Sequence, residues 1–244
     1  MIRLFTDLPE GAAFVLALLA YYTYAMVGLL AVRWTLERAG VAKTQPVMAG
    51  WSTALAALTA LLFTFVVANL WQNANLTRTR VDGEAAAIRL LARDIAPGQR
   101  GLLRDYARSI VTDDWPLLCG GGGSPRTTAL LARLENRAKP ADPAVRADLY
   151  VQLASLANLR DARLQAGGPG IPIEIWFTLI LLSALLLGIT FFGYHEHLGF
   201  QIGMTLVLAT ALATLFWLTV QLDFPFCGGT TVGPGAILQA IKTL

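Results

Sequence analysis

The stretch FVVANLWQNANLTRTRVDGEAAAIRLLARDI, residues Phe65–Ile95, decides how this chain folds. Its first part is apolar and uncharged, its second part is rich in Arg, Asp and Glu, and no proline interrupts it. Ala85, Ile88, Leu91 and Ile95 recur at helical spacing, so they would form one apolar stripe. The stretch therefore predicts a single helix that leaves a membrane and continues through water as an amphipathic helix.

The apolar part belongs to one of four long segments that contain no Asp, Glu, Lys or Arg: Gly11–Val32, Thr44–Thr77, Ile175–His195 and His197–Leu222. About 20 helical residues suffice to cross the hydrocarbon core, which is roughly 30 Å thick. The chain is 14% charged, whereas a soluble domain usually carries about 25% charged residues. We therefore predict an all-α integral membrane protein with four transmembrane helices.

Most charged residues lie between the second and third apolar segments. Four crossings place this polar region on the same side as both termini. Near the membrane that side is richer in basic residues than the two short connections opposite, and it includes Arg78, Arg80, Arg160 and Arg163. By the positive-inside rule the polar region and both termini are predicted to be cytoplasmic.

The predicted organisation has four parts. Helices one and two occupy residues 1–77, the cytoplasmic region 78–172, helices three and four 173–222, and a cytoplasmic tail 223–244. The cytoplasmic region has too little strand signal for an α/β domain, so we expect it to be helical.

Three further helices are expected in the cytoplasmic region. The first follows Pro97 and closes near the sequence TDDWP, with Tyr106 on its apolar face. The others span Thr127–Ala138 and Pro143–Gln165, the last with Asp142 as its N-cap.

The sequence offers little chemistry for catalysis. His195, Glu196 and His197 form a cluster in the short turn between the third and fourth apolar segments. Alternate residues of a tight turn do not readily converge on one metal ion, which needs roughly three or four ligands, so a polar turn is favoured over a metal site. The sequence contains no catalytic triad, HExxH or CxxC pattern, and we predict neither an enzyme nor a cofactor.

Cys119 and Cys227 both fall on the predicted cytoplasmic side, where thiols are kept reduced. We therefore expect no structural disulfide. The net charge of +3 is explained by basic residues beside helix ends, which contact anionic membrane lipids. No nucleic-acid partner is predicted.

The predicted membrane interior holds hydroxyl groups and small residues where a cation pump would place ionisable ones. On the second helix Thr53, Ala57, Ala60 and Thr64 share one face. Such a face can serve as helix–helix contact or as pore lining. Four helices alone enclose too little space for a pore, whereas a ring of identical subunits could form one.

Several ordered motifs together are similar to the bacterial bestrophin-like domain family. They are FVVANLWQN followed by VDGEAAAIRLL, then LRDYARSIVTDDWP, LANLRDARLQA and LDFPFCGG. With the arrangement of two helices, a polar region and two helices, the resemblance covers nearly the full chain.

The resemblance implies a pentameric ion channel of a bacterial inner membrane, conducting inorganic ions, with anions as candidates, through a pore lined by helix two. The family's hydrophobic neck maps onto Thr53, Ala57 and Leu61, beside Thr64, and Phe65 could replace the missing bulk. The alternative is a non-conducting sensor or scaffold that acts through its cytoplasmic helices.

The motif LDFPFCGG is similar to the turn that precedes a calcium-binding acidic run in animal bestrophins. Here Asp223, Pro225 and Phe226 remain, but no acid follows Asp223, so no metal site is expected. A carboxylate at a helix C-terminus opposes the macrodipole. We therefore expect Asp223 to pair with an arginine: Arg78, Arg80, Arg160 or Arg163.

Overall fold

The computed structural model describes residues 10–39, 48–137, 146–168, 170–193, 197–227 and 232–244. Every regular element among these residues is a helix, which confirms the predicted all-α class. The chain divides into two compact units. The apolar unit comprises Met1–Trp71 and Ile171–Asp223, and the polar unit comprises Gln72–Gly170 and Phe224–Leu244.

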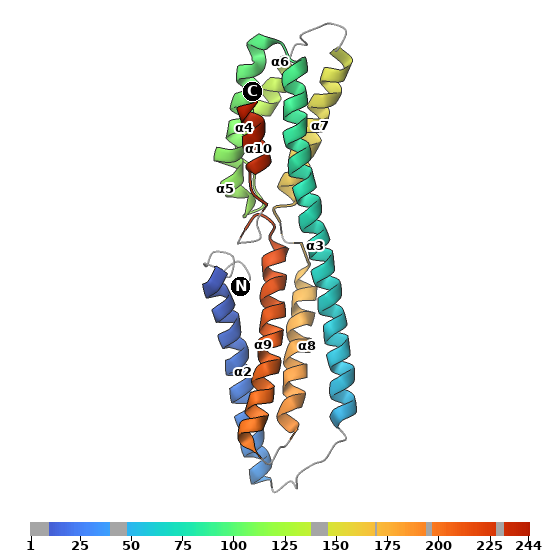
Figure 1. Ribbon diagram of the computed structural model, residues 1–244, viewed down its shortest axis with the longest axis vertical. Helices are drawn as coiled ribbons and strands as arrows, with labels where there is room; N and C mark the ends of the chain where they lie inside the picture. The colour runs from blue at the N-terminus through green and yellow to red at the C-terminus, as the bar shows by residue number, and fades with distance from the viewer. Residues whose placement is uncertain (1–9, 40–47, 138–145, 169, 194–196, 228–231) are drawn as a thin grey trace. The chain divides into compact units, whose positions relative to one another are not determined.

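The apolar unit is a helical bundle, and helix α3 contributes residues to both units. Among the described residues, four helices are long and apolar enough to span a membrane, as the uncharged segments predicted. They are α2 (Glu10–Arg38), α3 (Met48–Asp94), α8 (Ile173–Phe192) and α9 (Leu198–Asp223). Helix α2 lies against both α8 and α9 (Figure 1).

Polar contacts join α2 to its neighbours within this bundle. The hydroxyl groups of Tyr22 and Thr210 are 2.8 Å apart, and the Tyr24 hydroxyl donates to the Ala184 carbonyl at 3.1 Å. The backbones of α2 and α8 also approach closely, because a Cβ atom at Gly28 would collide with the ring of Phe191. These contacts fix α2 against α8 and α9.

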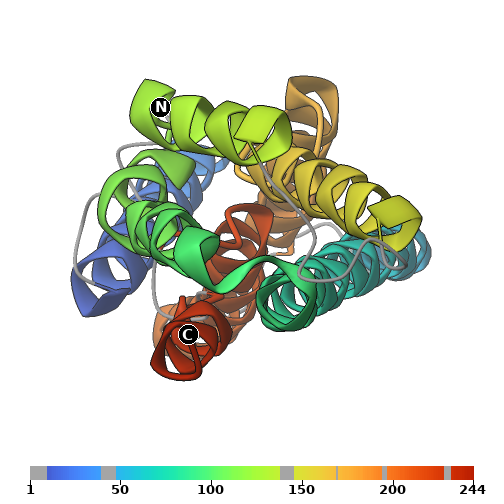
Figure 2. The same cartoon turned by 90° about the horizontal axis from the view of Figure 1, so that it is seen from above.

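In the described residues of the polar unit, the remainder of α3 is joined by seven shorter elements. They are η1 (Pro97–Gln99), α4 (Arg100–Ser109), the π-helical η2 (Ile110–Asp114), α5 (Trp115–Leu118), α6 (Pro125–Arg137), α7 (Arg146–Gln165) and α10 (Gly235–Lys242). Figure 2 views the same elements from above. The expected N-cap Asp142 and the following Pro143 lie outside the described residues.

The core of the polar unit is built on the stripe that the sequence predicted. Ala85, Ile88 and Leu91 on α3, and Ile95 directly after it, are fully buried. They pack in one cluster with apolar residues of α4, α6, α7 and α10, including Tyr106. A helix that continues without proline can present this stripe over several turns because its apolar positions follow the 3.6-residue period.

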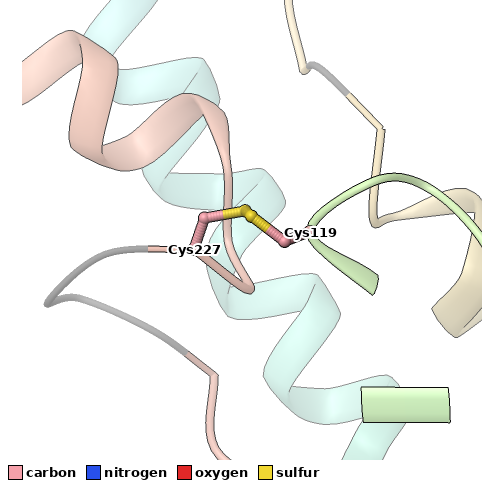
Figure 3. The surroundings of a disulfide bond; sticks show 2 residues. All are labelled: Cys119 and Cys227. Carbon is pink, nitrogen blue, oxygen red and sulfur yellow. A yellow bond between two sulfur atoms is a disulfide. The ribbon is translucent and has the colours of Figure 1, made fainter. Parts of the chain in front are cut away.

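The polar unit also contains a disulfide between Cys119 and Cys227 (Figure 3). The expectation of two free thiols was therefore wrong. It rested on the compartment predicted from charge, whereas the pairing depends on chain packing. The fold brings the loop after α5 beside the turn after α9, and the two Cα atoms are 5.4 Å apart although 108 residues separate them.

Candidate functional site

One face of α3 in the apolar unit is exposed among the residues that the structure describes. The pore-lining candidates Thr53, Ala57 and Thr64 are exposed, and Leu61 and Phe65 are 70% and 67% exposed. The opposite side of the helix is buried, through Phe63, Val66 and Leu70. The predicted residues thus share one outward-facing, exposed side of α3.

The outer face of α3 differs in chemistry from that of α8. On α8 the large exposed residues are aliphatic or aromatic: Ile173, Phe177, Ile180, Leu181, Leu185 and Phe192. On α3 the exposed set includes many small or hydroxyl-bearing residues: Thr53, Ala54, Ala57, Ala60, Thr64 and Ala68. Small residues let helices approach closely. The α3 face is therefore suited to protein or water contact, and the α8 face to lipid.

Asp223, at the end of α9, is buried in the apolar unit with 1% of its surface exposed. Its Oδ1 accepts a hydrogen bond from the Ile171 backbone N–H at 2.9 Å, and its Oδ2 accepts one from the Trp176 indole N–H at 3.3 Å. Ile171 lies just before α8 and Trp176 lies in its first turns, where the helix dipole is positive. These two donors contribute to stabilising the buried carboxylate, and the expected pairing of Asp223 with an arginine stays a prediction.

Arg160 and Arg163, two of the arginines expected beside Asp223, bind the carboxylates of Glu84 and Asp114.

The turn that follows Asp223 belongs to the polar unit. The Pro225 carbonyl accepts a hydrogen bond from the Val232 N–H at 2.7 Å. Phe226 packs edge-on against Trp115, with ring centroids 5.6 Å apart. The turn thus serves as packing and hydrogen-bonding structure.

Metal ligands do not converge in the described part of the chain, where no three His, Cys, Asp or Glu side chains could hold an ion. Of the histidine cluster, His195 and Glu196 lie outside the described residues.

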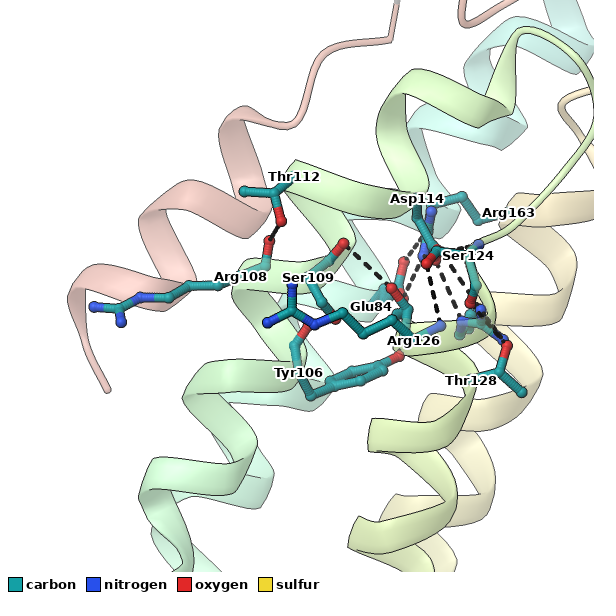
Figure 4. Close-up of polar contacts among 12 residues, drawn as sticks. Glu84, Tyr106, Arg108, Ser109, Thr112, Asp114, Ser124, Arg126, Thr128 and Arg163 are labelled. Carbon is teal, nitrogen blue, oxygen red and sulfur yellow. Dashed lines mark hydrogen bonds and ion pairs between the residues drawn. The ribbon is translucent and has the colours of Figure 1, made fainter.

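Figure 4 shows a buried network of ion pairs in the polar unit. This network was not predicted from the sequence. The Arg163 guanidinium on α7 donates to Glu84 on α3 at 2.6 Å and to Asp114 on η2 at 2.9 Å. Arg160, one turn earlier on α7, donates to Asp114 at 3.3 Å. Asp114 also accepts the Ser124 backbone N–H at 2.7 Å. Two arginines and two carboxylates thus balance their charges inside the unit.

Burial and charge together shift the titration of this network. Burial disfavours the guanidinium cation of Arg163, but Glu84 and Asp114 outweigh that effect, so its pKa is raised above the ordinary value. Burial also raises the pKa of Tyr106 well above its ordinary value, and the Glu84 charge acts in the same direction. Burial raises the pKa of Glu84 as well, and the Arg163 charge opposes that effect. The contacts of Arg163 with Glu84 and Asp114 tie α3, η2 and α7 together.

The sequence contained a signal for the network that was not recognised as a contact. Glu84, Asp114, Arg160 and Arg163 all fall within the motifs VDGE, TDDWP and LRDAR that carried the family resemblance. Each of these three motifs therefore contributes at least one charged residue to the same buried network.

Solved structures and a family model were found to be similar to this chain. Structural matches include a substituted form of a bacterial bestrophin homologue from Klebsiella pneumoniae, at TM-score 0.66 and 16% identity, covering 94% of this chain and 97% of that chain. Another structure of a bestrophin homologue from the same organism matches at TM-score 0.63 and 16% identity, covering 93% of this chain and 95% of that one. A comparison with curated proteins finds no match. Residues 19–237 match the Bestrophin-like domain, and the chain therefore belongs to that family of membrane proteins.

Proposed function

We propose that the protein is a homo-oligomeric ion channel whose pore is lined by the outer face of α3. The observation that carries the proposal is that Ala57, Leu61, Thr64 and Phe65 are exposed on one face of α3, which is rich in small and hydroxyl-bearing residues. Identical copies arranged around an axis would bring one such face from each subunit toward the centre. Family membership and the bestrophin-like fold support this arrangement.

Leu61 and Phe65 form the constriction in this proposal. They lie four residues apart on α3, so they point in similar directions from successive turns. Their side chains are 70% and 67% exposed in the single subunit. Rings of apolar side chains can gate ion flow by excluding water. Thr53, Ala57 and Thr64 would leave a wider, more polar path beside this constriction.

The family resemblance supports five subunits and a bacterial inner membrane, and the distribution of basic residues supports cytoplasmic termini. The disulfide between Cys119 and Cys227 favours an oxidising compartment instead, so the side of the membrane on which the polar unit lies is to be tested with the proposal. Membrane lipid would contact the aliphatic face of α8. Inorganic ions are the proposed substrates, with anions as the first class to test.

The proposal is tested by ion flux into liposomes that contain the purified protein. We expect the wild type to conduct, and Leu61→Ala and Phe65→Ala to change the conductance or its ion selectivity. Phe177→Ala on α8 is a matched control, because Phe177 is 66% exposed and Phe65 is 67% exposed. Absence of flux from intact oligomers would favour a non-conducting scaffold, and equal effects of both Phe substitutions would reject α3 as the pore lining.

A further inference from the structure

Three arginine side chains line one cavity of the polar unit. Arg89 and Arg93 come from α3, and Arg100 comes from the start of α4. The other lining residues are Ala92, Thr243 and Leu244, and the cavity has a volume of about 310 Å³. Helices α4 and α10 lie side by side in this unit, so the arginines converge from two helices on a built concavity.

The three guanidinium groups carry positive charge that no acid in the described part of the chain offsets by an ion pair. Arg89 and Arg93 are four residues apart on one helix, a spacing at which like charges repel each other. By contrast, Arg160 and Arg163 are buried against carboxylates in the same unit. The side chains that line the cavity therefore bring together three positive charges and no negative one, and all three arginines are exposed to solvent.

A second cavity in the polar unit does not share the basic lining of the first cavity. It has a similar volume, about 330 Å³, and lies between α3 and the start of α10. Its charged lining residues are Arg78 and Asp82, one of each sign. Size and position in the polar unit thus do not by themselves produce a cavity whose charged side chains are all basic.

We propose that the cavity lined by Arg89, Arg93 and Arg100 binds a multiply charged phosphate group. Guanidinium groups present several N–H donors in a planar fork that matches phosphate oxygens, and each such contact joins opposite charges. Pockets for small ligands start at about 300 Å³, so the volume accommodates a phosphate with part of the molecule that carries it. The phosphate can come from a free anion or from a lipid headgroup. The site does not depend on channel activity.

Calorimetric titration of the full chain in neutral detergent with inorganic pyrophosphate, at constant ionic strength, tests the free-anion source. We expect saturable binding that weakens about tenfold or more in Arg89→Gln, Arg93→Gln and Arg100→Gln, because each removes a charge-assisted hydrogen bond. Arg133→Gln on α6 is the matched control, since Arg133 is exposed and does not line the cavity. Thermal unfolding of each variant checks that the fold is retained.

The lipid source is tested with the same variants on nanodiscs that contain phosphatidic acid or only neutral lipid. Binding of labelled phosphatidic acid that is lost in Arg89→Gln, without pyrophosphate binding, assigns the site to a lipid phosphate. Pyrophosphate binding lost in the same variant assigns it to a free anion. The proposal is overturned if neither probe binds, or if Arg133→Gln weakens binding as much as the three cavity variants.

Discussion

The Arg163 guanidinium donates through Nε to the Glu84 carboxylate at 2.6 Å, with both side chains fully buried. Arg163 also binds Asp114, so one cation joins acids from two other elements of the polar unit. A buried charge loses favourable solvation free energy. Interactions inside the protein offset that loss only when every partner of the charge is in place. The network therefore makes the packing of α3, η2 and α7 depend on all its members.

Replacing Arg163 by Met should destabilise the protein strongly, because Glu84 and Asp114 would lose their principal cation inside the unit. Removing one partner of a buried ion pair typically costs about 3–5 kcal/mol. Arg126→Met is the control, since Arg126 pairs with Asp113 at 3.5 Å while 75% exposed, and exposed pairs contribute about 0–1 kcal/mol. Unfolding of the purified protein in detergent measures both. Equal losses would contradict a structural role for the buried network.

Tyr106 should make stability fall at alkaline pH. Its pKa in the fold is raised by burial, whereas an unfolded tyrosine ionises near pH 10. Above about pH 10 the unfolded state therefore gains stability from ionisation that the folded state lacks. The Tyr106 hydroxyl donates a hydrogen bond to Glu84 Oε1 at 3.4 Å. The stability of Tyr106→Phe should therefore fall less steeply above that pH, but the variant should be about 1 kcal/mol less stable at neutral pH because this hydrogen bond is lost.

Unfolding measured from pH 7 to 11 tests this difference in slope. Tyr150→Phe is the matched control, because the Tyr150 side chain on α7 is 54% exposed. If Tyr106→Phe and wild type lose stability in parallel across the range, the buried phenol is not a source of the alkaline sensitivity.

Asp223→Asn should destabilise the apolar unit. Both carboxylate oxygens accept N–H donors, and an amide would turn its own N–H₂ group toward one of them. A mismatched buried polar group costs about 1–3 kcal/mol. Asp161→Asn makes the same chemical change at an exposed position on α7 and should shift stability by no more than about 0.5 kcal/mol. Similar unfolding midpoints for both variants would argue against the α8 contact.

The disulfide should be detectable as a pair of protected thiols. Denatured wild type purified without reductant should label with maleimide at neither Cys119 nor Cys227, and at both after reduction. Reduction should lower the free energy of unfolding by about 2–4 kcal/mol, while the double variant Cys119→Ser/Cys227→Ser should be insensitive to reductant. Full labelling before reduction would mean that the thiols are not joined.

Local patterns made the helical architecture predictable. The uncharged runs identified the membrane helices because the hydrocarbon core sets their length. The stripe from Ala85 to Ile95 identified a buried helix face because its period is a property of the helix itself. Both features can be read from residues close together in the sequence, and the structure confirmed both.

The pairings that depend on tertiary packing could not be predicted in the same way. Glu84 and Arg163 are 79 residues apart, and the two cysteines are 108 residues apart. Their contacts follow from how helices pack, which no local period encodes. The hydrogen bonds that Asp223 accepts from Ile171 and Trp176 span 52 and 47 residues, so they too depend on packing. The role of Leu61 and Phe65 depends on further copies of the chain and stays a prediction.

An image of the detergent-solubilised particle down its symmetry axis, together with its mass, tests the channel proposal most directly. The account predicts a ring of five subunits with α3 innermost and with Leu61 and Phe65 at the narrowest point of an axial path. A particle in which α3 faces lipid, or in which side chains of another helix fill the axis, would contradict it.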